Sequence, residues 1–221
     1  MPVSVAARVP RLRSVTEASA RAVNACKYRA MRSTFAAFAL LLAPCAALAE
    51  NGNWSTTVYG ARISTQPGWE DLFLDTAGTE FTDSYLLVGA LAHRYAQRYD
   101  GALAIEWEGQ VVRHFGDQQH WEFNALPILL RWQRFPWNER IATSAAFGLG
   151  LSWATEMPRV EVELEGESHR TLVYWVMELT AGPPSKDWAV SLRLHHRSVG
   201  YGLMGDEGGM NAVGLGVRFA F

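Results

Sequence analysis

The segment from Val190 to Ser198 places strongly polar and apolar side chains on opposite faces of one strand. It reads Val-Ser-Leu-Arg-Leu-His-His-Arg-Ser. Because successive strand side chains point to opposite sides, the leucines share a face with His196 and Ser198, while two arginines and His195 share the other. A soluble protein would bury the leucines and expose the arginines. A membrane barrel does the reverse, with apolar residues facing lipid and polar residues facing the lumen.

The N-terminal region predicts export. Phe35 to Ala49 carries no charge, follows Arg32 and ends in Ala47-Leu48-Ala49, a small-x-small cleavage pattern. Such a stretch is typical of a secretory signal peptide and is too short for a spanning helix. We therefore expect residues 1–49 to be a removed extension and signal peptide, with Met1 and Met31 both open as the start. Residues 50–221 would form a single domain in the outer membrane of a Gram-negative bacterium.

The composition of residues 50–221 excludes several classes of protein. This part has 13 basic and 21 acidic residues, a net charge of −8, which argues against nucleic-acid binding. Both cysteines precede residue 50, so disulfides and cysteine metal sites are excluded. All nine tryptophans follow residue 50, as an interfacial aromatic girdle requires. We expect no cofactor and no metal ion; an ion held by His114 and His120, which flank a turn, is the weaker alternative.

Eight segments have about the length that a tilted membrane strand needs. They are Trp54–Ser64, Ser84–Tyr95, Ala102–His114, Trp121–Trp132, Ile141–Trp153, Thr171–Ala181, Trp188–Ser198 and Asn211–Phe221.

The connections between these strands alternate in length. Short ones (Ala96–Gly101, Gln133–Arg140, Gly182–Asp187) alternate with long ones (Thr65–Asp83, Ala154–Arg170, Val199–Met210), and only Phe115–His120 departs from the pattern. Short periplasmic turns and long extracellular loops are typical of outer-membrane proteins. The sequence thus predicts an all-β fold, an eight-stranded antiparallel transmembrane β-barrel of the outer-membrane type. A periplasmic β-sandwich or lipocalin-like barrel is the alternative.

Three polar residues on the predicted lipid-facing wall could form a site for nucleophilic catalysis. His196, Ser198 and Asn211 fall on one face of adjacent strands, near the extracellular end. Histidine can activate a serine hydroxyl near neutral pH. A third group makes the histidine a better base by fixing the tautomer of its imidazole. Asn211 is the candidate third group; Asp206 and Glu207 are alternatives. Backbone amides near Val199 and Gly200 could stabilise an oxyanion.

These residues resemble a known family. The run Arg193-Leu-His-His-Arg-Ser198, followed by a glycine-containing loop, Gly209-Met-Asn211 and a terminal strand, is similar to the acyloxyacyl hydrolase or lipid A 3-O-deacylase (PagL-type) family. The resemblance implies that Ser198 is the nucleophile, His196 the base and Asn211 the orienting residue. It also implies hydrolysis of the 3-O-linked acyl chain of lipid A, with lipopolysaccharide and membrane lipid as partners. The sequence leaves a homodimer open.

Other polar residues have simpler interpretations. His195 is expected in a lumen network with Glu106, Glu108 or Glu178, since buried charges need partners. The alternating glutamates from Glu161 to Glu167 suggest a solvated outer hairpin edge, or less strongly a site for divalent cations. A non-enzymatic small barrel serving adhesion or envelope integrity remains the alternative function. A pore is disfavoured, because side chains fill an eight-stranded barrel.

Overall fold

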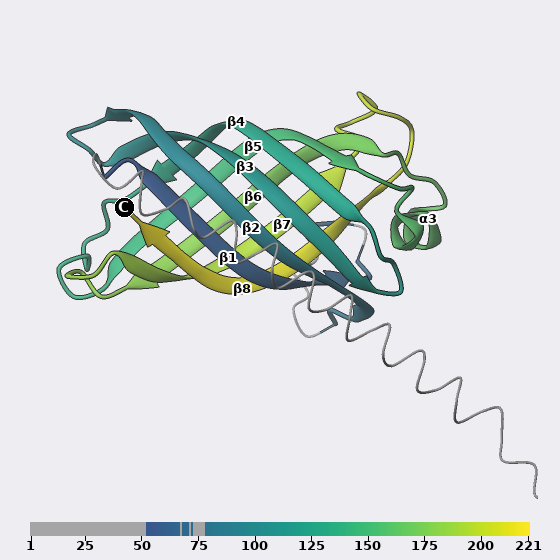
Figure 1. Ribbon diagram of the computed structural model, residues 1–221, viewed down its shortest axis with the longest axis horizontal. Helices are drawn as coiled ribbons and strands as arrows, with labels where there is room; N and C mark the ends of the chain where they lie inside the picture. Colours follow the sequence, from purple (N-terminus) through teal and green to yellow (C-terminus); the bar gives the residue numbers. More distant parts are fainter. Residues whose placement is uncertain (1–51, 67, 71, 73–77) are drawn as a thin grey trace, which may run out of the picture. The chain divides into compact units, whose positions relative to one another are not determined.

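The computed structural model describes residues 52–66, 68–70, 72 and 78–221, so the predicted signal peptide at 1–49 lies outside the described residues. The described chain forms eight antiparallel strands, each bonded to the next. Strand β1 also pairs with β8, from Ser55 opposite Ala220 to Ile63 opposite Ala212, which closes the sheet (Figure 1). The predicted all-β, eight-stranded antiparallel barrel is confirmed.

The predicted strands are all present. Three have the predicted bounds: β1 Trp54–Ser64, β4 Trp121–Trp132 and β7 Trp188–Ser198. The others are shifted or extended: β2 Phe81–Arg98, β3 Leu103–Gly116, β5 Ala142–Ala154, β6 Thr171–Gly182 and β8 Gly209–Ala220. Strand β2 lengthens most because both of its ends pair with neighbouring strands beyond the predicted limits. Ser64 pairs with Phe81 at one end, and Arg98 pairs with Leu103 at the other.

The two ends of the barrel differ. Turns 99–102, 133–141 and 183–187 share one end with the start of β1 and the end of β8, here called the short-loop end. Connections 65–80, 155–170 and 199–208 lie at the other, the long-loop end, together with the short turn at 117–120. The end with α3 in Figure 1 is the long-loop end.

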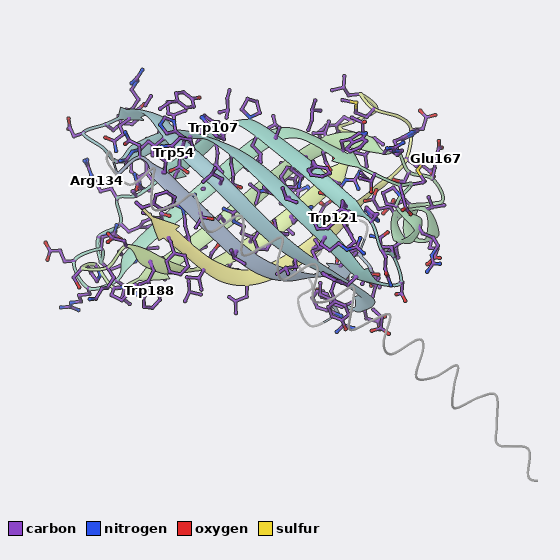
Figure 2. All side chains as sticks on the ribbon, in the orientation of Figure 1. Trp54, Trp107, Trp121, Arg134, Glu167 and Trp188 are labelled. Atoms are coloured by element: carbon purple, nitrogen blue, oxygen red, sulfur yellow. The ribbon has the colours of Figure 1, made fainter. Side chains whose placement is uncertain are left out.

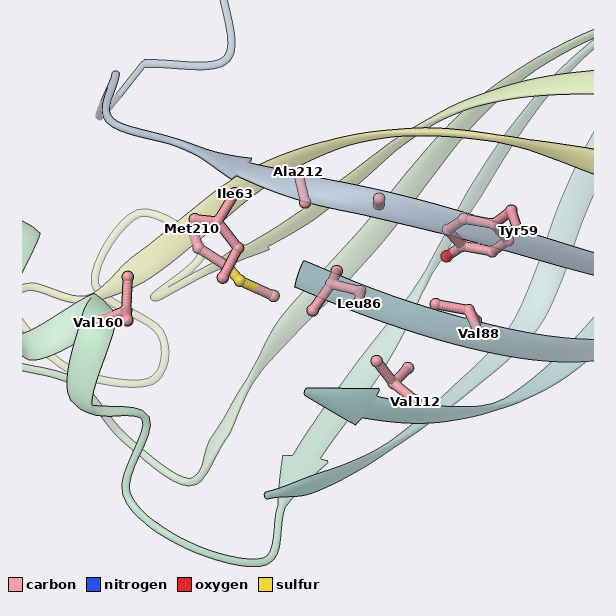
Figure 3. Packing of buried hydrophobic residues seen from close by; sticks show 9 residues of the cluster. Tyr59, Ile63, Leu86, Val88, Val112, Val160, Met210 and Ala212 are labelled. Atoms are coloured by element: carbon pink, nitrogen blue, oxygen red, sulfur yellow. The ribbon is translucent and has the colours of Figure 1, made fainter. Parts of the chain in front are cut away.

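The helix α3, Arg159–Glu165, overturns the predicted hairpin edge. The glutamates alternate by two in the sequence, but the segment forms a helix that buries Val160 and Glu161. Val160 packs with Met210, Ile63 and other apolar side chains inside the long-loop end (Figure 3). This apolar contact fixes the helix over the lumen, where a solvated hairpin would bury nothing. No helix among the described residues has the length and apolar character to cross a membrane.

The barrel wall is apolar outside and largely polar inside. Large exposed apolar side chains follow the outward positions of several strands, among them Phe147, Leu149, Leu151, Trp153, Leu179, Leu192, Leu215 and Phe219. Trp54, Trp107 and Trp188 lie toward the short-loop end, and Trp121 toward the long-loop end (Figure 2). This is the inverted polarity that the alternation in β7 predicted.

Candidate active site

His196 and Asn211 meet on the outer wall. They are directly opposite each other in the β7–β8 register, and His196 Nδ1 lies 2.6 Å from Asn211 Oδ1. The side-chain amide of Asn211 donates through Nδ2 to the Gln66 carbonyl oxygen at 3.1 Å. Because a backbone carbonyl can only accept, this bond fixes Oδ1 as the acceptor toward the histidine. His196 Nδ1 therefore carries the proton, and Nε2 keeps the lone pair that a general base needs.

Ser198 lies on the same wall, two residues beyond His196. It pairs with Gly209 on β8 and with Val173 on β6. Residues two apart in a strand have Cα atoms about 6.6 Å apart, close to the combined reach of the two side chains. In the described part of the chain, no hydrogen bond joins Ser198 Oγ to His196. Such contacts are often long in ligand-free enzymes and shorten when substrate binds.

The predicted oxyanion donors follow the serine directly. Gly200 has φ +62°, and a Cβ there would lie 2.5 Å from Val173 Cγ2, so only glycine fits. The Val199 carbonyl accepts a hydrogen bond from Met204 N–H at 2.9 Å, which turns the chain away from β7. Within the described residues, neither the Val199 nor the Gly200 amide donates to a backbone carbonyl.

The two alternatives to Asn211 as the third residue of the site lie away from His196. Asp206 and Glu207 are both exposed in the connection between β7 and β8. The carboxylate of Glu207 lies against Gly166, at the end of α3. Thus the structure brings Asn211 to His196, and places Asp206 and Glu207 in the solvent-exposed loop.

His196 faces outward but is covered, which the sequence did not predict. Its exposed fraction is 7%, and that of Asn211 is 1%. The Trp175 ring stacks on the imidazole at 4.3 Å, and Trp69 meets Trp175 edge-on at 5.6 Å. Strand register could have identified Trp175, which is opposite His196 on β6. Gln66 and Trp69 belong to the connection between β1 and β2, and no sequence pattern predicted their contacts with Asn211 and Trp175.

Buried charges fill the barrel interior toward the short-loop end. Arg193 forms a two-pronged ion pair with Glu108 at 2.7 and 2.9 Å and a bond to Glu178 at 3.0 Å. Arg131 bonds to Glu178 at 2.6 Å and to Glu106 at 3.2 Å. Each arginine is therefore compensated by two carboxylates, as buried charges require.

His195 belongs to this interior, but its predicted acidic partner was wrong. Its Nε2 lies 3.0 Å from Glu122, rather than from Glu106, Glu108 or Glu178. The hydroxyls of Tyr59 and Tyr174 approach its Nδ1 at 3.0 and 3.2 Å. The reason is the position of His195 along the strand. His195 is the next lumen-facing residue after Arg193 toward the long-loop end, and at that level the nearby carboxylate comes from Glu122 on β4. The adjacent histidines thus lie on opposite faces of the wall, His195 inside and His196 outside.

The helix α3 joins the interior network through Glu161. Its carboxylate accepts from Arg197 at 2.7 Å and from the Ser168 hydroxyl at 2.6 Å. Burial raises the pKa of Glu161 to about 7, although the charge of Arg197 opposes the shift. Arg197 lies between His196 and Ser198 in sequence, so the helix is anchored to the strand that carries the candidate site.

Comparisons with known proteins assign no family to this chain. The sequence matches no protein-family profile, and no curated protein matches it. Among solved structures, the chain is similar to LpxR from Salmonella typhimurium, with 12% identity and a TM-score of 0.33. The alignment covers 78% of this chain and 69% of that one. At this TM-score the similarity identifies neither a family nor an activity.

Proposed function

We propose that the protein is an outer-membrane esterase that removes the 3-O-linked acyl chain of lipid A. The observation that carries the proposal is the 2.6 Å His196–Asn211 hydrogen bond, on the outer wall of a closed barrel and beside Ser198. A histidine with a fixed tautomer next to a serine is the arrangement that nucleophilic ester hydrolysis requires.

The proposed mechanism gives each residue of the site a separate task. His196 Nε2 takes the proton of Ser198 Oγ as the oxygen attacks the ester carbonyl carbon. The amides of Val199 and Gly200 donate to the resulting oxyanion. His196 then returns the proton to the departing sugar oxygen, and a water molecule hydrolyses the acyl-serine. Asn211 stabilises the imidazolium less than a carboxylate would, because its side chain is neutral.

The position of the site favours a membrane lipid as substrate. Below His196 toward the short-loop end, the outer wall presents Leu192 and Leu179, each about half exposed. Acyl chains lie along such a wall, and an ester at the level of His196 would lie near the glucosamine headgroup of lipopolysaccharide in the outer leaflet. Hydrolysis there would release a 3-hydroxy fatty acid.

The proposal is tested by expressing the protein in a bacterium that lacks such an enzyme and analysing its lipid A by mass spectrometry. We expect the loss of one 3-hydroxyacyl chain, and no loss with Ser198→Ala or His196→Ala. The matched control is His93→Ala, because His93 is a histidine at the far end of the barrel, where its ring contacts that of Trp54 in a tilted arrangement. Unchanged lipid A despite folded protein in the outer membrane would refute the proposal and favour the non-enzymatic barrel.

A further inference from the structure

A second cluster of reactive side chains lies inside the barrel, separate from the outer-wall site. His114 on β3, His120 in the turn before β4 and Glu122 on β4 have exposed fractions of 0, 2 and 0%. One donor atom from each lies within 4.8 Å of the others. The His114 amide donates to the His120 carbonyl at 3.0 Å, which holds the turn closed and the two rings together.

His120 has a buried nitrogen without a partner. Its Nε2 makes no hydrogen bond within the described chain, and its ring stacks on that of His114 at 3.9 Å. A neutral imidazole offers the lone pair of one ring nitrogen to a metal ion. A buried polar atom without a partner costs free energy, and a missing water or ion is a common explanation.

The hydrogen bonds of His114 show what binding an ion would require. Its Nε2 lies 2.9 Å from Glu122, and the Gln118 amide lies 3.0 Å from its Nδ1. Gln118 Oε1 accepts from the Val160 amide, so Gln118 donates to Nδ1, and the proton of His114 is on Nε2. For Nε2 to bind an ion, this proton must move to Nδ1, and the Gln118 amide must turn so that its oxygen accepts it. An oxygen acceptor behind a metal-bound histidine is the usual arrangement.

We propose that His114, His120 and Glu122 bind one divalent first-row transition ion, with zinc as the representative. Two imidazoles and one carboxylate suit zinc, whereas calcium and magnesium prefer oxygen ligands. Donor atoms around tetrahedral zinc lie about 3.4 Å apart, so any pair of donors near the 4.8 Å limit must close by up to about 1.4 Å. Rotation of His120, whose Nε2 has no hydrogen-bond partner among the described residues, can supply this movement.

The charge around the cluster is compatible with a cation. Glu122 faces Arg197 at 3.7 Å, and Arg197 is also paired with Glu161 at 2.7 Å. His195, hydrogen-bonded to Glu122 from the opposite side, completes the surroundings. Two carboxylates, Glu122 and Glu161, and one guanidinium, Arg197, therefore lie together beside the histidines. The bound ion would link β3, the turn and β4 beneath α3, independently of any esterase activity.

The test uses the full barrel, purified from outer membranes in detergent and stripped with a chelator. Zinc chloride is titrated in competition with a chromophoric zinc chelator, and cobalt(II) chloride is added separately to record its visible absorption. We expect one ion per chain, a raised thermal unfolding temperature and a cobalt spectrum typical of nitrogen and oxygen ligands. His120→Ala should lower zinc affinity at least 100-fold and abolish the rise in unfolding temperature.

His120→Ala is the informative variant because it removes no side-chain hydrogen bond that the structure shows, so the barrel should still fold. Folding is checked by the mobility difference between heated and unheated samples on gels. His93→Ala, which changes a histidine on the outer wall, is the matched control and should bind zinc like the wild type. Absence of one-to-one binding in the wild type, or equal affinity in wild type and His120→Ala, would overturn the proposal.

Discussion

Replacing Asn211 with alanine tests whether this residue orients the proposed base. The substitution removes the 2.6 Å bond to His196 Nδ1 and the 3.1 Å bond to the Gln66 carbonyl. The imidazole can then adopt the other tautomer, which leaves Nε2 protonated and unable to accept the serine proton. We therefore expect Asn211→Ala to slow hydrolysis without abolishing it.

The size of the effect follows from the lost hydrogen bond. A bond to a group that becomes charged contributes about 1.5–3 kcal/mol, and His196 becomes an imidazolium in the transition state. Each 1.36 kcal/mol corresponds to a tenfold change in rate, so kcat should fall roughly 10- to 150-fold. KM should change little, because Asn211 is 1% exposed and is not expected to touch the substrate.

The assay measures release of 3-hydroxy fatty acid from purified lipopolysaccharide in detergent, at several substrate concentrations. Asp206→Ala and Glu207→Ala are the controls and should retain the wild-type kcat, because both side chains are exposed in the loop. A wild-type rate for Asn211→Ala, combined with a loss in either control, would refute the assignment of Asn211. In that case a loop carboxylate would have to reach His196 when substrate binds.

Three further substitutions test the surroundings of the site. Arg193→Met leaves Glu108 and Glu178 without their shared cation and should lower the free energy of unfolding in lipid vesicles by about 3–5 kcal/mol, whereas exposed Arg159→Met should leave it nearly unchanged. Glu161 has a folded pKa raised to about 7 from 4.5, so its protonated form favours folding. As the pH rises from 4.5 to 7, the free energy of unfolding of the wild type should fall by up to about 3 kcal/mol, and Glu161→Gln should not show this fall. Gly200→Ala should lower activity because a Cβ would lie 2.5 Å from Val173. The double variant Gly200→Ala/Val173→Ala should recover only part of the activity, since the positive φ at residue 200 remains strained. Full activity of Gly200→Ala would argue against an ordered oxyanion loop.

The sequence by itself determined the barrel and the two faces of its wall. Strand side chains alternate with a period of two, so each residue in β7 is assigned to the lumen or the exterior without tertiary information. That periodicity separated His195 from His196 and predicted that Asn211 faces outward on the next strand. The sequence thus predicted that His196 and Asn211 lie near each other on one face, and the structure placed them directly opposite each other in the register.

The tertiary structure decided what covers and surrounds these residues. The connection after β1 supplies the Gln66 carbonyl that fixes the Asn211 amide, and α3 replaces a predicted hairpin because Val160 and Glu161 find partners inside the barrel. Likewise, His195 bonds to Glu122 across the lumen, 73 residues away in sequence. Local periodicity sets the face of a strand to which a residue belongs. Contacts across the lumen and along the wall depend on the closure of the sheet and the path of its loops, which no local pattern encodes.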